Sequence, residues 1–322
     1  MSTLPEALSS GSLPGVILLF GPEHYLRRRY KAQVREAVTG GDEMNCTVFS
    51  GKNPELREVK DLAETMPFFA ERRLIILEDT GLFSGSHEDW AAFAAAVPDS
   101  CVLLFDEETV DKRGKLYKAV LKAGIPCDCQ PLEEKPLQAW AVRYLGKAGK
   151  RITNSGCARL LEYAGPDLDN LASEMEKLIA AVGEGTDITE DTVKDVCIRS
   201  LESSVFALTD AVAAGEEARA MAVYTDMLAR RESGMRLLAL IERQFRQLLA
   251  AKECGGGRNA IMDALHVSYG VAGRLSRQAE RFSGEKLQKL LAYCAEQEAA
   301  FKSGRLSEQL ALEMVIVTAL RQ

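Results

Sequence analysis

Short apolar runs alternate with helical patterns in the first part of the chain, and this alternation limits the fold more than any other feature. The runs occupy residues 16–20, 45–49, 73–78, 101–105 and 125–129. Between them, apolar side chains recur at three- and four-residue steps, as in segments 54–66 and 112–123. Short buried strands joined by helices form a parallel sheet with helices on both faces. We therefore predict an α/β domain at residues 1–135.

Helical patterns continue after Pro136, but no further strand run follows. Capped helix starts are expected at Thr153, at Asp167 or Asp169, and at Thr189. Longer helices are expected at residues 216–231, 233–252 and 284–303, and their apolar faces look too extensive for one small bundle. The pattern predicts two all-α domains, residues 136–202 and 203–322, with the second packing against other protein chains.

The charge balance restricts the partners. The net charge is −7 and the pI is about 5.3. A chain this acidic is a poor candidate for binding nucleic acid over its whole surface, although a local basic face is not excluded. No apolar run approaches the roughly 20 residues of a membrane span, and residues 1–15 lack the basic and apolar regions of a secretory signal. We expect a cytoplasmic protein without membrane contact.

A strand, a Gly21-Pro22 turn and a helical pattern follow one another at residues 16–38, which is an arrangement that often binds phosphate. A P-loop reads G-x-x-x-x-G-K-[ST], but the residues after Gly21 supply neither the second glycine nor the Lys-Ser/Thr pair. Glu23 would also repel an anion at the helix start. We expect the shape of a phosphate loop without nucleotide hydrolysis, and neither catalytic residues nor a cofactor.

The stretch VLLFDEE at residues 102–108 resembles the acidic motif that holds magnesium in NTPases. Those carboxylates act only on a bound triphosphate, so we expect Asp106, Glu107 and Glu108 to be solvated at a strand end. A divergent NTPase that uses them is the enzymatic alternative.

The eight cysteines are interpreted mainly as core residues, because the three histidines lack metal-ligand spacing to one another or to the Cys127/Cys129 pair.

The stretch TMPFFAERR at residues 65–73 is anomalous because two phenylalanines follow a helix-breaking proline. Consecutive loop residues do not easily turn into the same core. One reading buries one phenylalanine and leaves the other partly exposed. The functional reading is an apolar plug for a pocket on a partner, since aromatic anchors dominate interfaces. The candidate residues are Met66, Pro67, Phe68 and Phe69.

Basic residues step along two helical patterns near the C-terminus. They are Arg243 and Arg246 in the first, and Arg274, Arg277 and Arg281 in the second. A solvated or ion-paired face is the ordinary meaning of such spacing. The alternative is contact with phosphates or with a neighbouring subunit, and its extreme form is a standalone nucleic-acid-binding helical protein.

Over almost its whole length the sequence resembles the delta subunit family of the bacterial DNA polymerase III clamp loader. The resemblance is carried by the order and spacing of several stretches, among them LLFGPEHYLRRR, MPFFAERRLIIL, CQPLEEKPLQAWAVRYLGKAGKRI and IERQFRQLLAAKE. It implies a degenerate AAA+-like α/β domain, a lid-like domain and a collar domain, in a non-catalytic subunit that binds no ATP.

The resemblance also implies partners. They are the ring-shaped sliding clamp (beta subunit), the ATPase and delta-prime subunits met through the collar, and primed DNA within the complex. The implied role is to open the clamp so that it can be loaded on DNA. The family contacts the clamp through an apolar pair that is often Leu-Phe, and this chain has Phe68-Phe69 at that position. The change keeps the apolar character but alters the shape.

Overall fold

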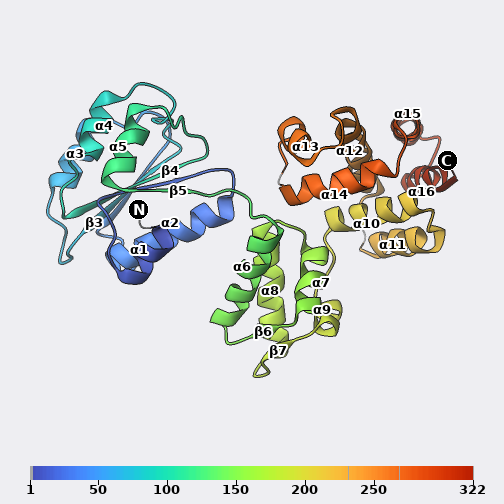
Figure 1. Cartoon of the computed structure of the whole chain (residues 1–322), viewed down its shortest axis with the longest axis horizontal. Helices are drawn as coiled ribbons and strands as arrows, with labels where there is room; N and C mark the ends of the chain where they lie inside the picture. Colours follow the sequence, from blue (N-terminus) through green and yellow to red (C-terminus); the bar gives the residue numbers. More distant parts are fainter. Residues whose placement is uncertain (1–2, 231, 268, 322) are drawn as a thin grey trace. The chain divides into compact units, whose positions relative to one another are not determined.

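The computed structural model describes residues 3–230, 232–267 and 269–321. The chain forms two compact units, residues 1–131 and 132–322, which we call the α/β unit and the helical unit (Figure 1). The unit boundary lies close to the expected domain boundary at residue 135. The division of the helical unit at residue 202 stays a prediction.

The α/β unit is built on a parallel five-stranded sheet with the strand order β2-β3-β4-β1-β5. Its strands are β1 (Val16–Phe20), β2 (Cys46–Ser50), β3 (Arg73–Glu78), β4 (Cys101–Glu107) and β5 (Ile125–Asp128). They coincide with the five predicted apolar runs apart from one or two residues at their ends. The predicted fold class, a parallel α/β sheet followed by helices, is confirmed.

Helices cover both faces of this sheet, as Figure 1 shows. One face carries α1 (Leu4–Ser10) and α2 (His24–Thr39), and the other carries α3 (Leu56–Glu64), α4 (Glu88–Ala94) and α5 (Lys115–Ala123). Neighbouring residues of β3 point to opposite faces: Leu74 packs with Val34 of α2, whereas Ile75 packs with Val59 of α3. This alternation decides below which partners the acidic end of β4 meets.

The first helices of the helical unit are α6 (Glu134–Lys147), α7 (Asn154–Ala164), α8 (Leu168–Val182) and α9 (Glu190–Val196). The predicted caps are confirmed, because the side chains of Thr153, Asp167 and Thr189 accept hydrogen bonds from the first turns of α7, α8 and α9. Of the two aspartates considered for α8, the structure selects Asp167.

The expectation that no strand follows Pro136 is wrong in detail. Strands β6 (Arg151–Ile152) and β7 (Asp187–Ile188) form a small parallel pair. Two-residue strands are too short to produce a periodic pattern, so the sequence could not reveal them. Ile188 is fully buried, and the pair joins the segments before α7 and α9.

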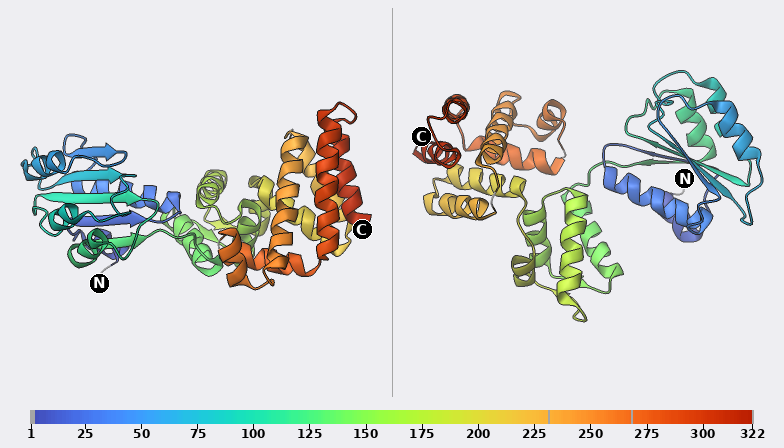
Figure 2. Two further views of the ribbon diagram at one scale, coloured as in Figure 1. Left: turned by 90° about the horizontal axis from the view of Figure 1, so that it is seen from above. Right: turned by 180° about the vertical axis from the view of Figure 1, so that it is seen from behind.

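The remaining helices are α10 (Leu201–Ala214), α11 (Glu217–Ala229), α12 (Gly234–Glu253), α13 (Arg258–Leu265), α14 (Tyr269–Glu280), α15 (Gly284–Lys302) and α16 (Glu308–Arg321). They share one hydrophobic core, with α12 packed against α10, α13, α14, α15 and α16. Figure 2 shows α12, α15 and α16 side by side.

That core uses most of the apolar surface that was expected to face other chains. Among the described residues of 203–322, the large hydrophobic side chains that stay exposed are Leu310 and Met314 on α16. The expectation that these helices leave extensive apolar faces uncovered was therefore wrong, because five other helices pack around α12.

Candidate functional site

The loop after β1 keeps the turn of a phosphate loop but directs its amides to the chain itself. Gly21 has a φ of +114°, and a Cβ there would lie 2.5 Å from the Cys129 carbonyl oxygen. The Gly21 N–H donates to the carbonyl of Glu108 at 3.2 Å, and the Glu23 N–H donates to that of Cys129 at 3.0 Å. Amides that would face a phosphate in a P-loop are thus already bonded.

The Glu23 side chain occupies the start of α2 as well. It caps this helix by accepting a hydrogen bond from the Tyr25 N–H at 3.1 Å. A carboxylate at a helix start satisfies one of the free amides and complements the helix dipole. The position where a phosphate would bind therefore already carries a negative charge of the protein.

The acidic end of β4 is buried, not solvated, and the expectation for two of its three residues was wrong. Asp106 and Glu107 are 6% and 4% exposed, and only Glu108 is exposed as expected. Because neighbouring strand residues point to opposite faces, Asp106 lies on the α2 side and Glu107 on the α3 side. The prediction from the sequence placed these residues at a solvated strand end. It did not include the helices that cover both faces of the sheet.

On the α2 side, Asp106 is neutralised by two cations. Its carboxylate lies 2.5 Å from the Arg27 guanidinium and 2.7 Å from the Lys31 ammonium, which also lies 2.7 Å from Glu78. Burial lowers the pKa of Lys31, but the bonds to Asp106 and Glu78 outweigh it and the net shift is upward. The ammonium stays charged, so Asp106 is held in an internal ion-pair network.

On the other side, Glu107 is held by the turn after β3. It accepts hydrogen bonds from the Thr80 hydroxyl, the Thr80 N–H at 3.0 Å and the Gly81 N–H at 3.3 Å. Burial raises the pKa of Glu107, and these hydrogen bonds partly oppose the rise. The role of Glu107 here is to fix a turn.

We expect that the isolated chain neither hydrolyses ATP nor binds it tightly, because the loop amides and Asp106 already have partners within the chain. Calorimetric titration with Mg-ATP and a phosphate-release assay measure this, with an ATPase that has a complete P-loop as the positive control. Saturable binding at micromolar ATP would contradict the expectation.

The other candidate, the loop between α3 and β3, lies at the amino end of β3 and therefore at the opposite end of the sheet. Both phenylalanines are exposed, Phe68 by 52% and Phe69 by 95%, and Met66 is exposed by 77%. The reading that buries one of the two rings is thus wrong. The rings touch edge to face, with centroids 4.5 Å apart. Pro67 is half-buried and directly precedes this pair, with Thr65 and Met66 between it and the end of α3 at Glu64.

The backbone of this loop is fixed in an unusual conformation. Phe69 has a φ of +47°, in the left-handed region that a bulky residue rarely adopts. Asn45, next to β2, makes hydrogen bonds of 2.7 and 2.8 Å to the N–H and carbonyl of Phe68. The sequence did not indicate Asn45, because 23 residues separate it from Phe68 and no local pattern joins them.

The arginine candidates divide between two cavities of the helical unit. A cavity of about 480 Å³ includes Arg243 and Arg274 in its lining, and one of about 330 Å³ includes Arg274, Arg277 and Arg281. Arg274 lines both, with its guanidinium 4.6 Å from the ring centre of Phe206. Arg246 instead pairs with Glu242 on its own helix. The structure thus brings four of the five predicted arginines to adjoining cavities.

Buried glutamines fix α14, which carries Arg274 and Arg277, against its neighbours. Gln244 of α12 donates to Gln278 of α14 at 2.7 Å, and Gln278 donates to the Phe206 carbonyl of α10 at 3.0 Å. Both glutamines are 3% exposed. Because buried amides are costly without partners, this network sets the register of the helices.

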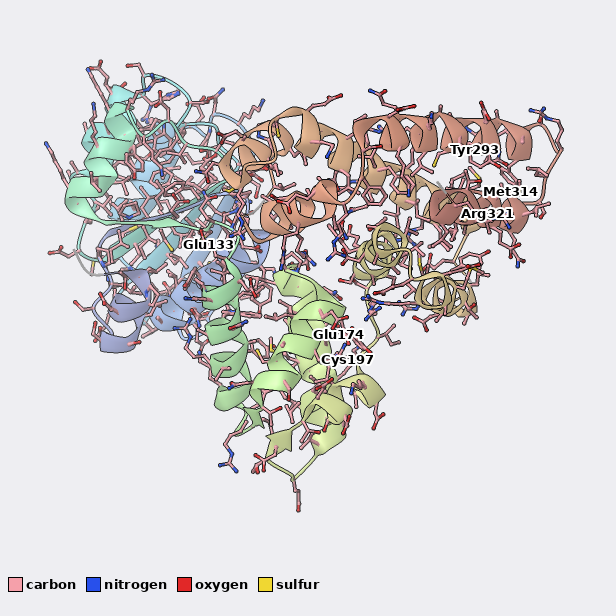
Figure 3. The ribbon with its side chains drawn as sticks, turned by 45° about the vertical axis from the view of Figure 1, so that its right-hand side comes forward. Glu133, Glu174, Cys197, Tyr293, Met314 and Arg321 are labelled. Atoms are coloured by element: carbon pink, nitrogen blue, oxygen red, sulfur yellow. The ribbon has the colours of Figure 1, made fainter. Side chains whose placement is uncertain are left out.

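The cysteines are free thiols, and five of the eight are buried. Cys197 lies beside Glu174 of α8, as labelled in Figure 3, and burial together with this carboxylate raises the pKa of its thiol to about 12. Such a thiol is inert at neutral pH.

In the part of the chain that the structure describes, no three His, Cys, Asp or Glu side chains are grouped so as to hold a metal ion. None of the described helices is long and apolar enough to cross a membrane.

Comparison with known proteins covers both units. The family model "DNA polymerase III, delta subunit" matches residues 18–130, and the model "DNA polymerase III delta subunit, C-terminal domain" matches residues 202–319. The DNA polymerase III subunit delta of Bacillus subtilis is 27% identical over 333 aligned positions, which cover 98% of this chain and 96% of that protein.

A solved structure agrees with these matches. The Bacillus subtilis DNA clamp loader delta protein aligns over 99% of both chains, with a TM-score of 0.85 and 26% identity. The first family model includes the Phe68-Phe69 loop, and the second includes all five candidate arginines. The chain therefore belongs to the DNA polymerase III delta subunit family.

Proposed function

We propose that this chain binds the sliding clamp through Met66, Pro67, Phe68 and Phe69 and opens the ring for loading on primed DNA. The observation that carries the proposal is the exposure of two adjoining phenylalanine rings on a loop with a fixed backbone. Large exposed apolar groups in a soluble domain mark interaction sites. Burying one phenylalanine in a pocket contributes about 1.5–3 kcal/mol.

Ring opening requires more than binding. A ligand shifts an equilibrium only by its difference in affinity for the two states, so the loop must bind the open clamp more tightly than the closed one. In this proposal ATP is bound and hydrolysed by neighbouring subunits, and the chain itself is a non-catalytic, cytoplasmic subunit of the polymerase holoenzyme without a cofactor. The internally bonded Gly21 loop supports that division of labour.

The direct test is a titration of purified sliding clamp with the isolated chain, followed by release of clamp already loaded on circular DNA. We expect saturable binding without ATP and faster release of the ring from circular DNA, whereas linear DNA serves as the control from which clamps slide off unaided. Lack of saturable binding would refute the proposal.

We further propose a three-domain organisation, with residues 1–135 carrying the clamp-binding loop, 136–202 a lid-like domain and 203–322 a collar. The collar would contact the ATPase subunits and delta-prime. Leu310 and Met314 support this assignment, because they lie one turn apart on α16 and both are 42% exposed (Met314 is labelled in Figure 3).

The arginine-lined cavities are a candidate contact for DNA phosphates or for a neighbouring subunit. The positive charge of their lining favours DNA phosphates. Arg219 joins Arg277 and Arg281 around the smaller cavity, where Asp210 is the acidic lining residue. Burial lowers the pKa of Arg274, and Arg277 adds to this against the opposing effect of Asp210. A bound anion would relieve the repulsion between these guanidinium groups.

Replacing Arg277 and Arg281 by glutamine is expected to weaken binding of primed DNA by the assembled clamp loader. The slope of log K against log salt should fall by about one for each phosphate that the protein no longer neutralises. Arg246→Gln is the matched control, because this residue pairs with Glu242 and is not among the lining residues. An unchanged slope together with a loss of subunit binding would assign these arginines to a protein interface.

A further inference from the structure

The Asn45 side chain ties the clamp-binding loop to the sheet. It is 0% exposed, its Oδ1 accepts a hydrogen bond from the Phe68 N–H at 2.7 Å, and its Nδ2 donates to the Phe68 carbonyl at 2.8 Å. We propose that Asn45 is a positioning residue that holds the Phe68-Phe69 pair in its clamp-binding geometry before the clamp arrives. The inference rests on the proposed clamp-binding function.

One carboxamide satisfies both backbone groups of Phe68, as a residue of a neighbouring antiparallel strand would do. The main chain of Asn45 is itself fixed, because its carbonyl accepts a hydrogen bond from the Leu74 N–H of β3 at 2.8 Å. Phe68 is thus connected through Asn45 to the edge of a five-stranded sheet. The aromatic pair lies on a loop, but its first residue is anchored like a strand residue.

Asp42 decides which way the carboxamide points. Its Oδ2 accepts a second hydrogen bond from Asn45 Nδ2 at 3.0 Å, while its Oδ1 accepts from the Met44 N–H at 2.9 Å. A reversed carboxamide would set its NH₂ group against the Phe68 N–H and its oxygen against the Asp42 carboxylate. Both pairings are repulsive, so the hydrogen-bond network fixes the orientation.

The exposed Phe69 depends on this anchor. Its left-handed backbone conformation costs energy and persists only where the surroundings hold it. The segment between α3 and β3 has no regular secondary structure to provide that support. A loop ordered in advance loses less conformational entropy on binding. Removing the anchor should therefore weaken clamp binding although Asn45 is buried and does not form the apolar contact.

The test compares clamp affinity in variants of the anchor. We expect Asn45→Ala to raise the Kd for the clamp about tenfold and Asp42→Ala about threefold, with no change in the apolar groups that bind. Asp42→Asn keeps an acceptor for Asn45 Nδ2 and should recover most of the affinity. Thr80→Ala is the matched control: it removes a buried side chain, also 0% exposed, that makes hydrogen bonds at the opposite end of the sheet. It should lower the melting temperature and leave the clamp Kd unchanged.

Two measurements separate positioning from a purely structural role. In a chain that already carries Phe68→Ala and Phe69→Ala, Asn45→Ala should cause no further loss of clamp affinity, because there is no ring pair left to position. Independently, 4-fluorophenylalanine at position 69 of the free chain should show a ¹⁹F shift set by the adjoining Phe68 ring. That shift should move toward the value of an unstructured peptide in Asn45→Ala and Asp42→Ala, but not in Thr80→Ala.

The outcomes distinguish the two proposals. If the unmodified chain fails to bind the clamp, the proposed function falls and this inference falls with it. If the chain binds and the double phenylalanine variant does not, while the Asn45 and Asp42 variants bind normally, only the positioning role is wrong. If Asn45→Ala does not fold, the clamp affinities of Asp42→Ala and Asp42→Asn and the ¹⁹F shift still test the positioning role, because Asp42 is exposed.

Discussion

Replacing Phe68 and Phe69 together by alanine is expected to weaken clamp binding by at least about 2 kcal/mol, a factor of thirty or more in Kd. Both rings are exposed in the free chain and would be buried in a pocket of the clamp, so the apolar transfer free energy is gained only on binding. The loop is fixed beforehand, so little of this gain is lost to ordering.

The same variant should fold normally. Surface substitutions usually change the free energy of unfolding by less than about 0.5 kcal/mol. Phe83→Ala is the matched control, because Phe83 is 2% exposed and packs on Phe105 in the sheet core with ring centroids 5.1 Å apart. That replacement should cost about 3–5 kcal/mol of stability and leave the clamp affinity of the folded fraction unchanged.

A melting curve and a clamp titration for each variant complete the comparison. If the Phe68/Phe69 variant lost several kcal/mol of stability but kept its affinity per folded molecule, the pair would have to be assigned to the fold and the clamp-binding loop sought elsewhere.

A chain that ends after residue 202 is expected not to enter the clamp-loader assembly at all, yet still to bind the clamp. The two hydrophobic clusters of the α/β unit contain only residues of that unit, so the clamp-binding loop keeps its support. The buried core cluster of residues 205–319 is removed as a whole, and with it the exposed pair Leu310 and Met314.

Co-elution with the ATPase subunits and delta-prime measures assembly, and the clamp titration measures the other function on the same sample. The full-length Phe68/Phe69 variant is the reciprocal control, since it should assemble and fail to bind the clamp. A shortened chain that joined the complex normally would show that residues 203–322 are not the collar.

Local patterns carried the fold prediction. Strand positions, the caps at Thr153 and Thr189 and the long helices depend on residues that are close in sequence, so periodicity and capping chemistry reveal them. The absence of a lysine and hydroxyl after Gly21 is equally local. Two-residue strands such as β6 and β7 fall below the length at which any period is visible.

Local sequence patterns predicted the candidate site only in part. The proline and the two phenylalanines stand out in the sequence, but the sequence could not decide whether one of the rings was buried. The acidic end of β4 was misjudged for the same reason, since the partners of Asp106 lie 75 and 79 residues away in α2. Burial and pairing of a polar group depend on what the fold places beside it.

The sequence by itself determined that this chain has a parallel α/β unit followed by helices, a phosphate-loop turn without phosphate chemistry, and an aromatic pair next to a helix end. Only the tertiary structure decided that both rings are exposed, that Arg27 and Lys31 neutralise Asp106, and that Asn45 holds Phe68. The physical reason is how far apart in the sequence the interacting residues lie. Backbone conformation follows from neighbours along the chain, whereas exposure, ion pairing and side-chain anchoring arise from contacts between residues that folding alone brings together.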